Sequence, residues 1–469
     1  MSNLAKNTAI YAIGDIAPRL LSFISFPILT TYLTPSEYGI INYVNTIGVF
    51  LTVIGFLCVN TYYLVYYYKL PTNELQQKLL GNLTIFIIFY NIILSFLLFL
   101  FGPYLMKLFG GEINFYPYIA IGIITNFFNL FSILPLALFR VQEKPLSVTI
   151  INIIRGICSF ALTIILVVIY NFKVLGVLYA NMLIAIVFAS IYLYITYKNS
   201  IWHYDWSQIK VILKFSLPLL PGSLSYYFVS MSDRILINKY VDLNSLGIYS
   251  TAATLALLLN IISYGGYKAF EPYIFKIYGT IDFKNKFITV YKNFLFILLM
   301  GAFALSLFAK EFFQLFSDIK YHEAYLYVPL IIIGVFVSSI AMLYGTVITA
   351  QGKTIINSLI SIIGGTVSII LNILLLPYIG LIAACLTSAV SMSTMLVISI
   401  YFSNLKISFN ETFLSILGVS IILYLSVYKF IIDDIVISII VKFIIYILML
   451  FSIKMLLKIG IINIFKRND

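Results

Sequence analysis

The chain has 469 residues, of which 62% are hydrophobic and only 10% are charged. A soluble domain is roughly half apolar and about a quarter charged, so this composition excludes a water-soluble globular protein. Because a helix needs about 20 apolar residues to cross a bilayer, the chain has room for many spans and excludes a large soluble domain as well. The net charge of +12 predicts cationic loops on the cytoplasmic side of a membrane rather than a nucleic-acid partner.

Apolar runs long enough to cross the bilayer recur along the whole chain. We therefore expect an all-α polytopic membrane protein with about 14 transmembrane helices joined by short turns. The predicted spans fall near residues 8–31, 39–62, 80–106, 115–140, 146–170, 175–197, 210–236, 246–268, 287–308, 325–350, 355–377, 380–403, 411–430 and 435–457.

Basic residues are distributed unevenly between the turns on the two sides of the membrane. If the N-terminus is cytoplasmic, six lysines fall in outer turns, whereas nineteen lysines and arginines fall in inner turns and tails. Because cationic loops are retained on the cytoplasmic side, we predict that both termini are cytoplasmic. An even number of spans agrees with this orientation.

Two local matches indicate an internal duplication. The segment around Gly39 aligns with that around Gly247 at an offset of 208, and Lys144 aligns with Lys353 at an offset of 209. Both offsets correspond to six spans, so the copies have the same membrane orientation and a pseudo-two-fold axis along the membrane normal. We predict a six-helix N-terminal lobe, a six-helix C-terminal lobe and two appended helices with a cytoplasmic tail, at residues 1–207, 208–404 and 405–469.

The first predicted span carries two ionisable residues. Asp15 and Arg19 are four residues apart and share a helix face, and Ser22 continues this polar stripe. An ionisable residue at membrane depth costs about 2.5–3.5 kcal/mol on insertion, so it should face a partner or a cavity. An ion pair buried between helices is one interpretation. The continued stripe favours the other, an anion site that lines a cavity.

The fifth predicted span carries Arg155 near its middle. Asn152 and Ser159 share the face of Arg155, and no acidic residue lies near it in the sequence. Small polar residues alone usually support helix packing, but packing does not require an unpaired guanidinium. The span therefore predicts a second cationic position in a cavity.

The seventh predicted span is polar and contains two prolines, Pro218 and Pro221, which predict a break in the helix. Nearer its outer end it carries Ser230, Asp233 and Arg234. Adjacent residues on a helix point about 100° apart. Two interpretations of Asp233 and Arg234 remain open. One is structural, a helix-end ion pair or a snorkelling arginine, and the other is a functional pair.

Other chemistries have little support in the sequence. The three cysteines and two histidines lie far apart, so we expect no metal site. No glycine-rich phosphate-binding loop is present, so we do not expect ATP hydrolysis. Lys442, in the last span, has no polar stripe around it and is expected to reach a membrane interface.

Five motifs carry a family resemblance: AKNTAIYAIG at 5–14, YLTPSEYG at 32–39, SLPLLPG at 216–222, SDRILI at 232–237 and LGIYS at 246–250. They resemble the O-antigen and polysaccharide flippases (Wzx-type) of the multidrug/oligosaccharidyl-lipid/polysaccharide exporter superfamily. The resemblance covers the whole chain and implies a MATE-like fold. It also implies a transporter of the bacterial inner (plasma) membrane, with no catalytic residues.

The resemblance implies a substrate as well. Such a flippase moves undecaprenyl-diphosphate-linked oligosaccharide to the outer leaflet by alternating access, for O-antigen and lipopolysaccharide synthesis, and the polysaccharide polymerase machinery is an expected partner. The diphosphate requires a cationic cavity, since guanidinium groups suit phosphate. The candidate substrate-binding residues are Arg19, Arg155 and Arg234, and the candidate polar lining is Asn152, Ser159, Ser22 and Ser230.

Coupling to an ion gradient is a further implication of the resemblance. Asp15 and Asp233 are the candidate residues for ion coupling or gating, with H+ or Na+ as the ion and no other cofactor.

Two alternatives to a flippase remain open. A multidrug exporter of the same fold would favour an acidic cavity for cationic drugs, and a membrane O-antigen polymerase or glycosyltransferase would have a large outer loop and no six-span duplication.

The charge asymmetry predicts which turns are accessible from outside the cell. In a cysteine-free background, single cysteines at Ser36 and Asn244 should react with a membrane-impermeant thiol reagent added to intact cells, because both positions lie in outer turns. Cysteines at Asn73 and Asn285 should react only after the cells are permeabilised. Labelling at Asn73 without labelling at Ser36 would invert the predicted orientation.

Overall fold

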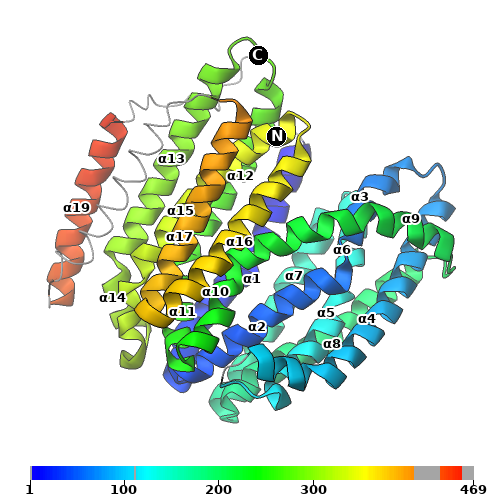
Figure 1. Cartoon of the computed structure of the whole chain (residues 1–469), viewed down its shortest axis with the longest axis horizontal. Helices are drawn as coiled ribbons and strands as arrows, with labels where there is room; N and C mark the ends of the chain where they lie inside the picture. The colour runs from blue at the N-terminus through cyan, green and yellow to red at the C-terminus, as the bar shows by residue number, and fades with distance from the viewer. Residues whose placement is uncertain (1–2, 110–111, 406–431, 433, 457–469) are drawn as a thin grey trace. The chain divides into compact units, whose positions relative to one another are not determined.

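The computed structural model describes residues 3–109, 112–405, 432 and 434–456 (Figure 1). Within these residues the regular structure is helical and contains no strand. Eleven helical stretches among them are long and apolar enough to cross a membrane. The prediction of an all-α polytopic membrane fold is confirmed.

The eleven stretches coincide with eleven of the predicted spans, and the other three differ in informative ways. Predicted span 8–31 lies in helix α1 (Asn3–Tyr32), of which Leu20–Tyr32 is a shorter apolar segment. Predicted span 210–236 is divided between two helices and is not among the eleven. Predicted span 411–430 lies outside the described residues, so the total number of spans stays a prediction.

The chain forms two compact units, Met1–Ser250 and Thr251–Asp469. This boundary follows packing between residues, whereas the predicted lobes at 1–207 and 208–404 follow the internal repeat. The division by repeat and its pseudo-two-fold axis therefore stay predictions.

Among its described residues, the first unit contains ten whole α-helices and the first part of α11. In chain order they are α1, α2 (Pro35–Phe56), α3 (Val59–Tyr66), α4 (Asn73–Phe109), α5 (Ala120–Leu130), α6 (Ile133–Val141), α7 (Pro145–Ile164), α8 (Lys173–Asn199), α9 (Trp206–Ser216), α10 (Leu220–Tyr240) and α11 (Leu243–Ala256). Helix α1 packs on α7, α5 packs on α8, and α2 packs on both α5 and α10. These contacts bring the predicted polar faces of α1 and α7 together.

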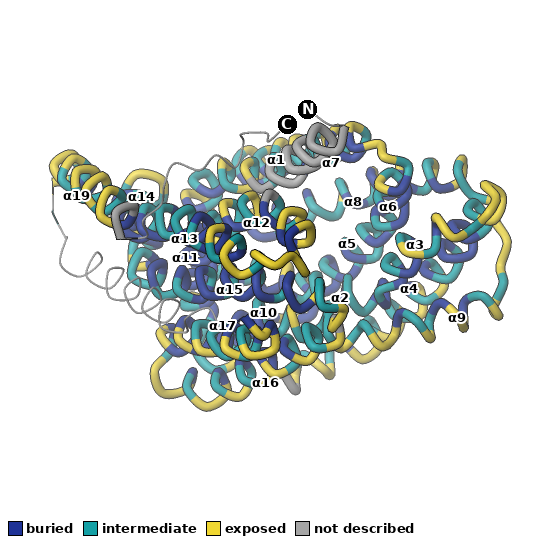
Figure 2. Tube along the Cα trace, turned by 90° about the horizontal axis from the view of Figure 1, so that it is seen from above, coloured by how far each residue is buried: buried dark blue, intermediate teal, exposed yellow. Residues whose placement is uncertain are grey.

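The second unit is a bundle in which α12, α13, α15, α16 and α17 run side by side (Figure 1). Its described helices are α12 (Leu258–Ile277), α13 (Phe283–Leu307), α14 (Ala309–Phe316), α15 (Val328–Ala350), α16 (Thr354–Ile379), α17 (Leu381–Ser403) and α19 (Ile435–Leu456). Helix α19 contacts α13 and α14 and exposes much of its remaining apolar surface, including Phe443 and Phe451 (Figure 2). Such a surface fits contact with lipid.

Two predicted spans are broken, and the two breaks lie side by side. The span predicted at 39–62 is not continuous, because Leu57 and Cys58 adopt left-handed backbone angles with φ of 48° and 58°. The seventh span is interrupted by a 3₁₀ turn at Leu217–Leu219, which confirms the break predicted from its prolines. Cys58 Sγ lies 3.4 Å from Ser223 Oγ and so joins the two breaks.

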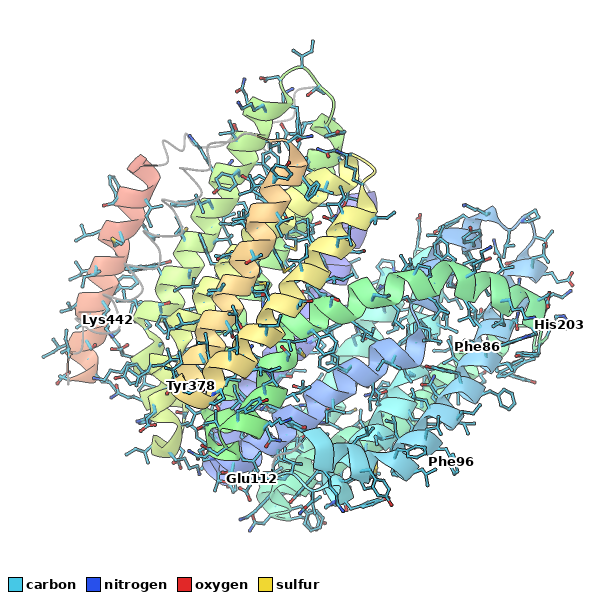
Figure 3. All side chains as sticks on the ribbon, in the orientation of Figure 1. Phe86, Phe96, Glu112, His203, Tyr378 and Lys442 are labelled. Carbon is cyan, nitrogen blue, oxygen red and sulfur yellow. The ribbon has the colours of Figure 1, made fainter. Side chains whose placement is uncertain are left out.

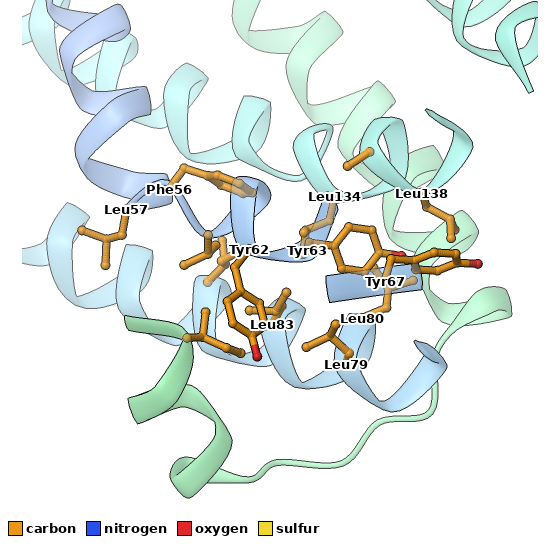
Figure 4. Close-up of a cluster of buried hydrophobic side chains, with 14 of the residues drawn as sticks. Phe56, Leu57, Tyr62, Tyr63, Tyr67, Leu79, Leu80, Leu83, Leu134 and Leu138 are labelled. Carbon is orange, nitrogen blue, oxygen red and sulfur yellow. The ribbon is translucent and has the colours of Figure 1, made fainter. Parts of the chain in front are cut away.

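Helices α3 and α9, which adjoin the two breaks, pack with α4 and α6 through a cluster of buried aromatic and aliphatic side chains (Figure 4). Tyr63 from α3 is fully buried, Leu83 comes from α4, and Leu134 comes from α6. Ile209 and Ile212 add the inner face of α9. With Phe56 of α2 and Leu130 of α5, the cluster ties six helices of the first unit together, at about 1.5–3 kcal/mol per fully buried large apolar side chain.

The start of α2 explains part of the motif at 32–39. The backbone N–H of Thr34 donates to Glu37 Oε2 (2.8 Å), and the N–H of Glu37 donates to Thr34 Oγ1 (3.3 Å). This reciprocal capping box satisfies two donors that the first helical turn leaves free. Pro35 occupies the first helical position, where no donor is needed.

Gly39 and Gly247, which the repeat matches to each other, meet in the first unit. A Cβ added at Gly39 would lie 2.5 Å from Leu243 O and 3.1 Å from the backbone N of Gly247, and one added at Gly247 would collide with Pro35 O. Only glycine lets the backbones of α2 and α11 approach this closely. The matched pair therefore has a packing role.

Lys442 does not reach an interface, so that expectation is wrong. Its side chain on α19 (Figure 3) is 2% exposed, and Nζ lies 2.6 Å from Glu311 Oε1 on α14. The hydroxyl of Ser438 donates to the same oxygen. Lys442 is thus neutralised by a partner far away in the sequence, and the pair fixes α19 against α14.

The close approach of α2 and α11 predicts a strong effect of one methyl group. Gly247→Ala should destabilise the protein by about 1–3 kcal/mol, the usual cost of overpacking, and should lower the apparent Tm of the purified protein. Gly48→Ala, in the partner helix α2, is the matched control, because a Cβ there meets nothing within 4 Å. The control should be neutral or stabilising by roughly 0.5–1 kcal/mol. Equal Tm values for the two variants would contradict the packing role.

Candidate functional site

A polar cavity of about 530 Å³ lies among helices α1, α2, α7 and α8 of the first unit. Amide, hydroxyl and guanidinium groups line much of its wall. They belong to Ser22, Ser25, Asn42, Asn45, Asn152, Arg155, Ser159, Thr163 and Asn181. A cavity of this size with several converging polar groups is a candidate ligand site.

Close contact between α1 and α7 places the polar face of α7 in this wall. Thr149 Oγ1 donates to the carbonyl oxygen of Ile10 (2.8 Å). A Cβ added at Gly14 would lie 2.6 Å from Thr149 Oγ1, and one at Gly156 would lie 3.5 Å from Pro18 Cα. These small residues let α7 lie against α1, which fixes the position of Arg155 in the cavity wall.

The guanidinium of Arg155 is held by an amide and not by a carboxylate. Its Nη2 donates to Asn129 Oδ1 (2.5 Å), and Cζ lies 6.0 Å from the ring centroid of Phe188, within reach of a cation–π contact. Arg155 is the one charged residue among those described as lining the cavity. Because an amide carries no net charge, the positive charge of Arg155 remains available to an anion.

A second cavity of about 330 Å³ adjoins the first. It lies among α2, α5 and α8, and its polar lining comes from Asn45, Thr52, Thr125, Asn126, Asn129 and Asn181. Asn45 and Asn181 line both cavities. The two spaces therefore form one polar region with Arg155 close to their common boundary.

The structure brings several predicted site residues together. Asn152, Arg155, Ser159 and Ser22 all line the first cavity, as their helical spacing suggested. Asp15 and Arg19 lie on α1, but their side chains are outside the described part of the chain. Their roles stay predictions.

Asp233 and Arg234 form a buried pair that is not among the residues lining either cavity. They are 3% and 8% exposed, and Arg234 Nη1 lies 3.6 Å from Asp233 Oδ1. Tyr249 donates its hydroxyl proton to Asp233 Oδ2, and Arg234 Nη1 donates to the carbonyl oxygen of Ser230. The geometry fits a buried ion pair, and a gating role for it stays a prediction.

Of the asparagines in the cavity walls, the sequence predicted Asn152 and not those on α2, α5 and α8. Asn42 and Asn45 are three apart on α2, and Asn126 and Asn129 are three apart on α5. Residues three apart share a helix face, so pairs of amides within apolar spans were the available signal.

Comparison with known proteins adds a family and a fold. Residues 4–278 match the family model described as polysaccharide biosynthesis protein, and residues 218–374 match the MatE model. The chain is 26% identical over 284 residues to the Lsg locus putative protein 1 of Haemophilus influenzae. That match covers 58% of this chain and 66% of the relative, slightly less than two thirds of its length.

Two solved structures share the fold at low sequence identity. One, titled lipid II flippase MurJ in an inward closed conformation, has a TM-score of 0.73 and 14% identity, and the match covers 95% of this chain and 98% of that one. The other, an inward-facing multidrug resistance MATE family transporter of the MOP superfamily, has a TM-score of 0.63 and 12% identity, covering 86% and 99%. The predicted MATE-like fold is confirmed.

The buried pair on α10 predicts a change in accessibility if it contributes to gating. Asp233→Asn should weaken the outward-closed state, because the neutral amide no longer holds Arg234. A cysteine at Ser230 should then react faster with an impermeant thiol reagent. Tyr249→Phe, which removes one donor and keeps both charges, should shift the rate in the same direction by less.

A static role would give a different result. Removing one partner of a buried ion pair costs about 3–5 kcal/mol, so the amount of protein in the membrane would fall. Reduced abundance with an unchanged labelling rate at Ser230 would assign the pair to stability alone.

Proposed function

Because the chain belongs to the polysaccharide biosynthesis protein family, we propose that it is a flippase for lipid-linked oligosaccharide. The substrate in this proposal is an undecaprenyl-diphosphate-linked glycan, moved from the cytoplasmic to the outer leaflet of the bacterial inner membrane. The observation that carries the proposal is the Arg155 guanidinium, which faces a polar cavity with no acidic side chain among its described lining residues. The fold shared with a lipid II flippase supports a lipid carrier.

The chemistry of the cavity suits a diphosphate group. A guanidinium presents a planar set of N–H donors that can bind two phosphate oxygens at once. Asn129 orients this group without neutralising it. Arg19 is proposed as a second cation, because its neighbours Pro18 and Ser22 line the same cavity.

The proposed transport cycle is alternating access driven by an ion gradient. H+ or Na+ is the proposed coupling ion, and Asp15 and Asp233 are the proposed responding residues. Since no bond is made or broken, the cycle needs no catalytic residue. With both termini in the cytoplasm, the flipped glycan would be delivered to polymerase machinery on the outer side.

A multidrug exporter is the second candidate, because residues 218–374 match the MatE model. A cationic drug would prefer a carboxylate in its binding cavity. Among the described residues that line the two cavities, the charged group is an arginine. This charge favours an anionic substrate.

The proposal predicts a loss of export when the cationic site is removed. Arg155→Ala should reduce surface polysaccharide about tenfold or more at equal protein level, since a hydrogen bond to a charged group contributes about 1.5–3 kcal/mol. Arg19→Ala should act in the same direction. Arg155→Lys should rescue only partly, because lysine keeps the charge but loses the planar fork.

Arg140→Ala is the matched control for these variants. Arg140 is exposed at the end of α6 and lies outside both cavities, so export should be normal. Normal surface polysaccharide in both Arg155→Ala and Arg19→Ala cells, at wild-type protein level, would discard the diphosphate site.

A further inference from the structure

The second cavity differs in chemistry from the first. Its polar wall consists of amide and hydroxyl side chains, and its described lining contains no charged residue. Val44, Val49 and Leu178 supply apolar surface beside these groups. These groups suit an uncharged ligand that forms many hydrogen bonds and also presents some apolar surface.

The amides of the second cavity are held in fixed orientations by protein partners. Asn126 is 7% exposed, and its Nδ2 donates to Gly48 O (2.8 Å) and to Thr52 Oγ1 (2.7 Å). Its Oδ1 thus remains an acceptor for a ligand. Asn129 and Asn181 use their Oδ1 atoms to accept from Arg155 and from Ser159, which leaves their Nδ2 groups as donors.

A mixed set of donors and acceptors discriminates between classes of ligand. A hydroxyl group both donates and accepts, so a polyhydroxylated ligand can satisfy both kinds of amide group. A hydrocarbon chain would leave these groups unpaired, at a cost in free energy. A second anionic group would find no cation in this wall. The lining therefore matches a neutral sugar, including one with an acetamido substituent.

The order of the two cavities matches the order of groups in a glycan linked to a diphosphate. Arg155 donates to Asn129, which lines the second cavity, and Asn45 and Asn181 line both. We propose that the second cavity binds the first, lipid-proximal sugar of the substrate, an uncharged hydroxyl- or acetamido-bearing residue, while Arg155 holds the adjoining diphosphate. This inference rests on the proposed flippase function and adds to it the site that recognises the glycan.

Gly48 offers a way to fill the second cavity without disturbing the fold. It lines the cavity, and a Cβ added there meets no atom within 4 Å. Gly48→Leu would place a side chain in the space of the sugar and leave every polar group in the wall. Gly265→Leu in α12 is the matched control, because its added Cβ also meets nothing and Gly265 lines neither cavity.

The test compares two kinds of lipid bound to the full-length protein in nanodiscs. The probes are undecaprenyl diphosphate, and undecaprenyl diphosphate carrying one N-acetylglucosamine or one galactose. The wild-type protein should bind at least one glycosylated lipid about tenfold more tightly than the bare lipid, as expected from a few neutral hydrogen bonds. Gly48→Leu should reduce this ratio to about one and leave the Kd for the bare lipid unchanged.

Two further variants sharpen the comparison. Thr125→Val removes one hydroxyl from the second cavity with little change in shape, and it should reduce the ratio by a smaller factor. Gly265→Leu should keep the wild-type ratio. Arg155→Gln should weaken binding of the bare and the glycosylated lipids by the same factor, since both carry the diphosphate.

The possible failures are distinguishable. If the bare lipid binds and depends on Arg155, but glycosylation gives no gain or Gly48→Leu keeps the gain, the sugar site is overturned and the flippase proposal stands. If the wild-type protein binds none of the lipids, or Arg155→Gln leaves their Kd values unchanged, the diphosphate site fails and the sugar site fails with it.

Discussion

The need to satisfy polar groups within the bilayer is the constraint on which the rest of this structure depends. No water is available in the hydrocarbon to pair with them, so each must find a protein partner or line a hydrated space. The second unit uses the first solution, in which Glu311 and Lys442 neutralise each other in a fully buried contact. Arg155 shows the second solution, because it lines a cavity and its guanidinium contacts the amide of Asn129 and the ring of Phe188. This distinction separates the residues that hold helices together from those that can meet a substrate.

The cavities exist because the helices around them are held closely elsewhere. Helix α1 touches α7 at Gly14 and Gly156, and α2 touches α11 at Gly39 and Gly247. Close backbone contact of this kind lets helices associate without a hydrophobic driving force between them. The helices can then stay apart at the polar face of α7, where the wall is lined by Asn152, Arg155 and Ser159. Close packing at these glycines thus leaves room for a cavity where the helices present larger polar side chains.

Sequence alone predicted the features that are local and missed those that depend on distant residues. Apolar runs identify spans because each run is continuous, and the face of Arg155 followed from helical spacing. The break at Leu57 and Cys58 was missed, because two consecutive left-handed L-residues carry no glycine or proline signal. The burial of Lys442 was missed because its partner, Glu311, lies on another helix far away in the sequence. The grouping of the amides on α2, α5 and α8 around the cavity of Arg155 was missed for the same reason, since these helices are far apart in the sequence.

Arg155 and Arg234, both in the first unit, differ in what they can still bind. Arg234 lies against Asp233, so the charge of the pair is compensated and an incoming anion would have to compete with a carboxylate already in place. Removing such a partner from a buried position is costly. Arg155 has an amide in the corresponding role, and the amide fixes its geometry without cancelling its charge. A guanidinium that is held by an amide can therefore still bind an anion. A guanidinium that is held by a carboxylate is already neutralised, so it suits a stabilising role or an exchange of partners between two conformational states.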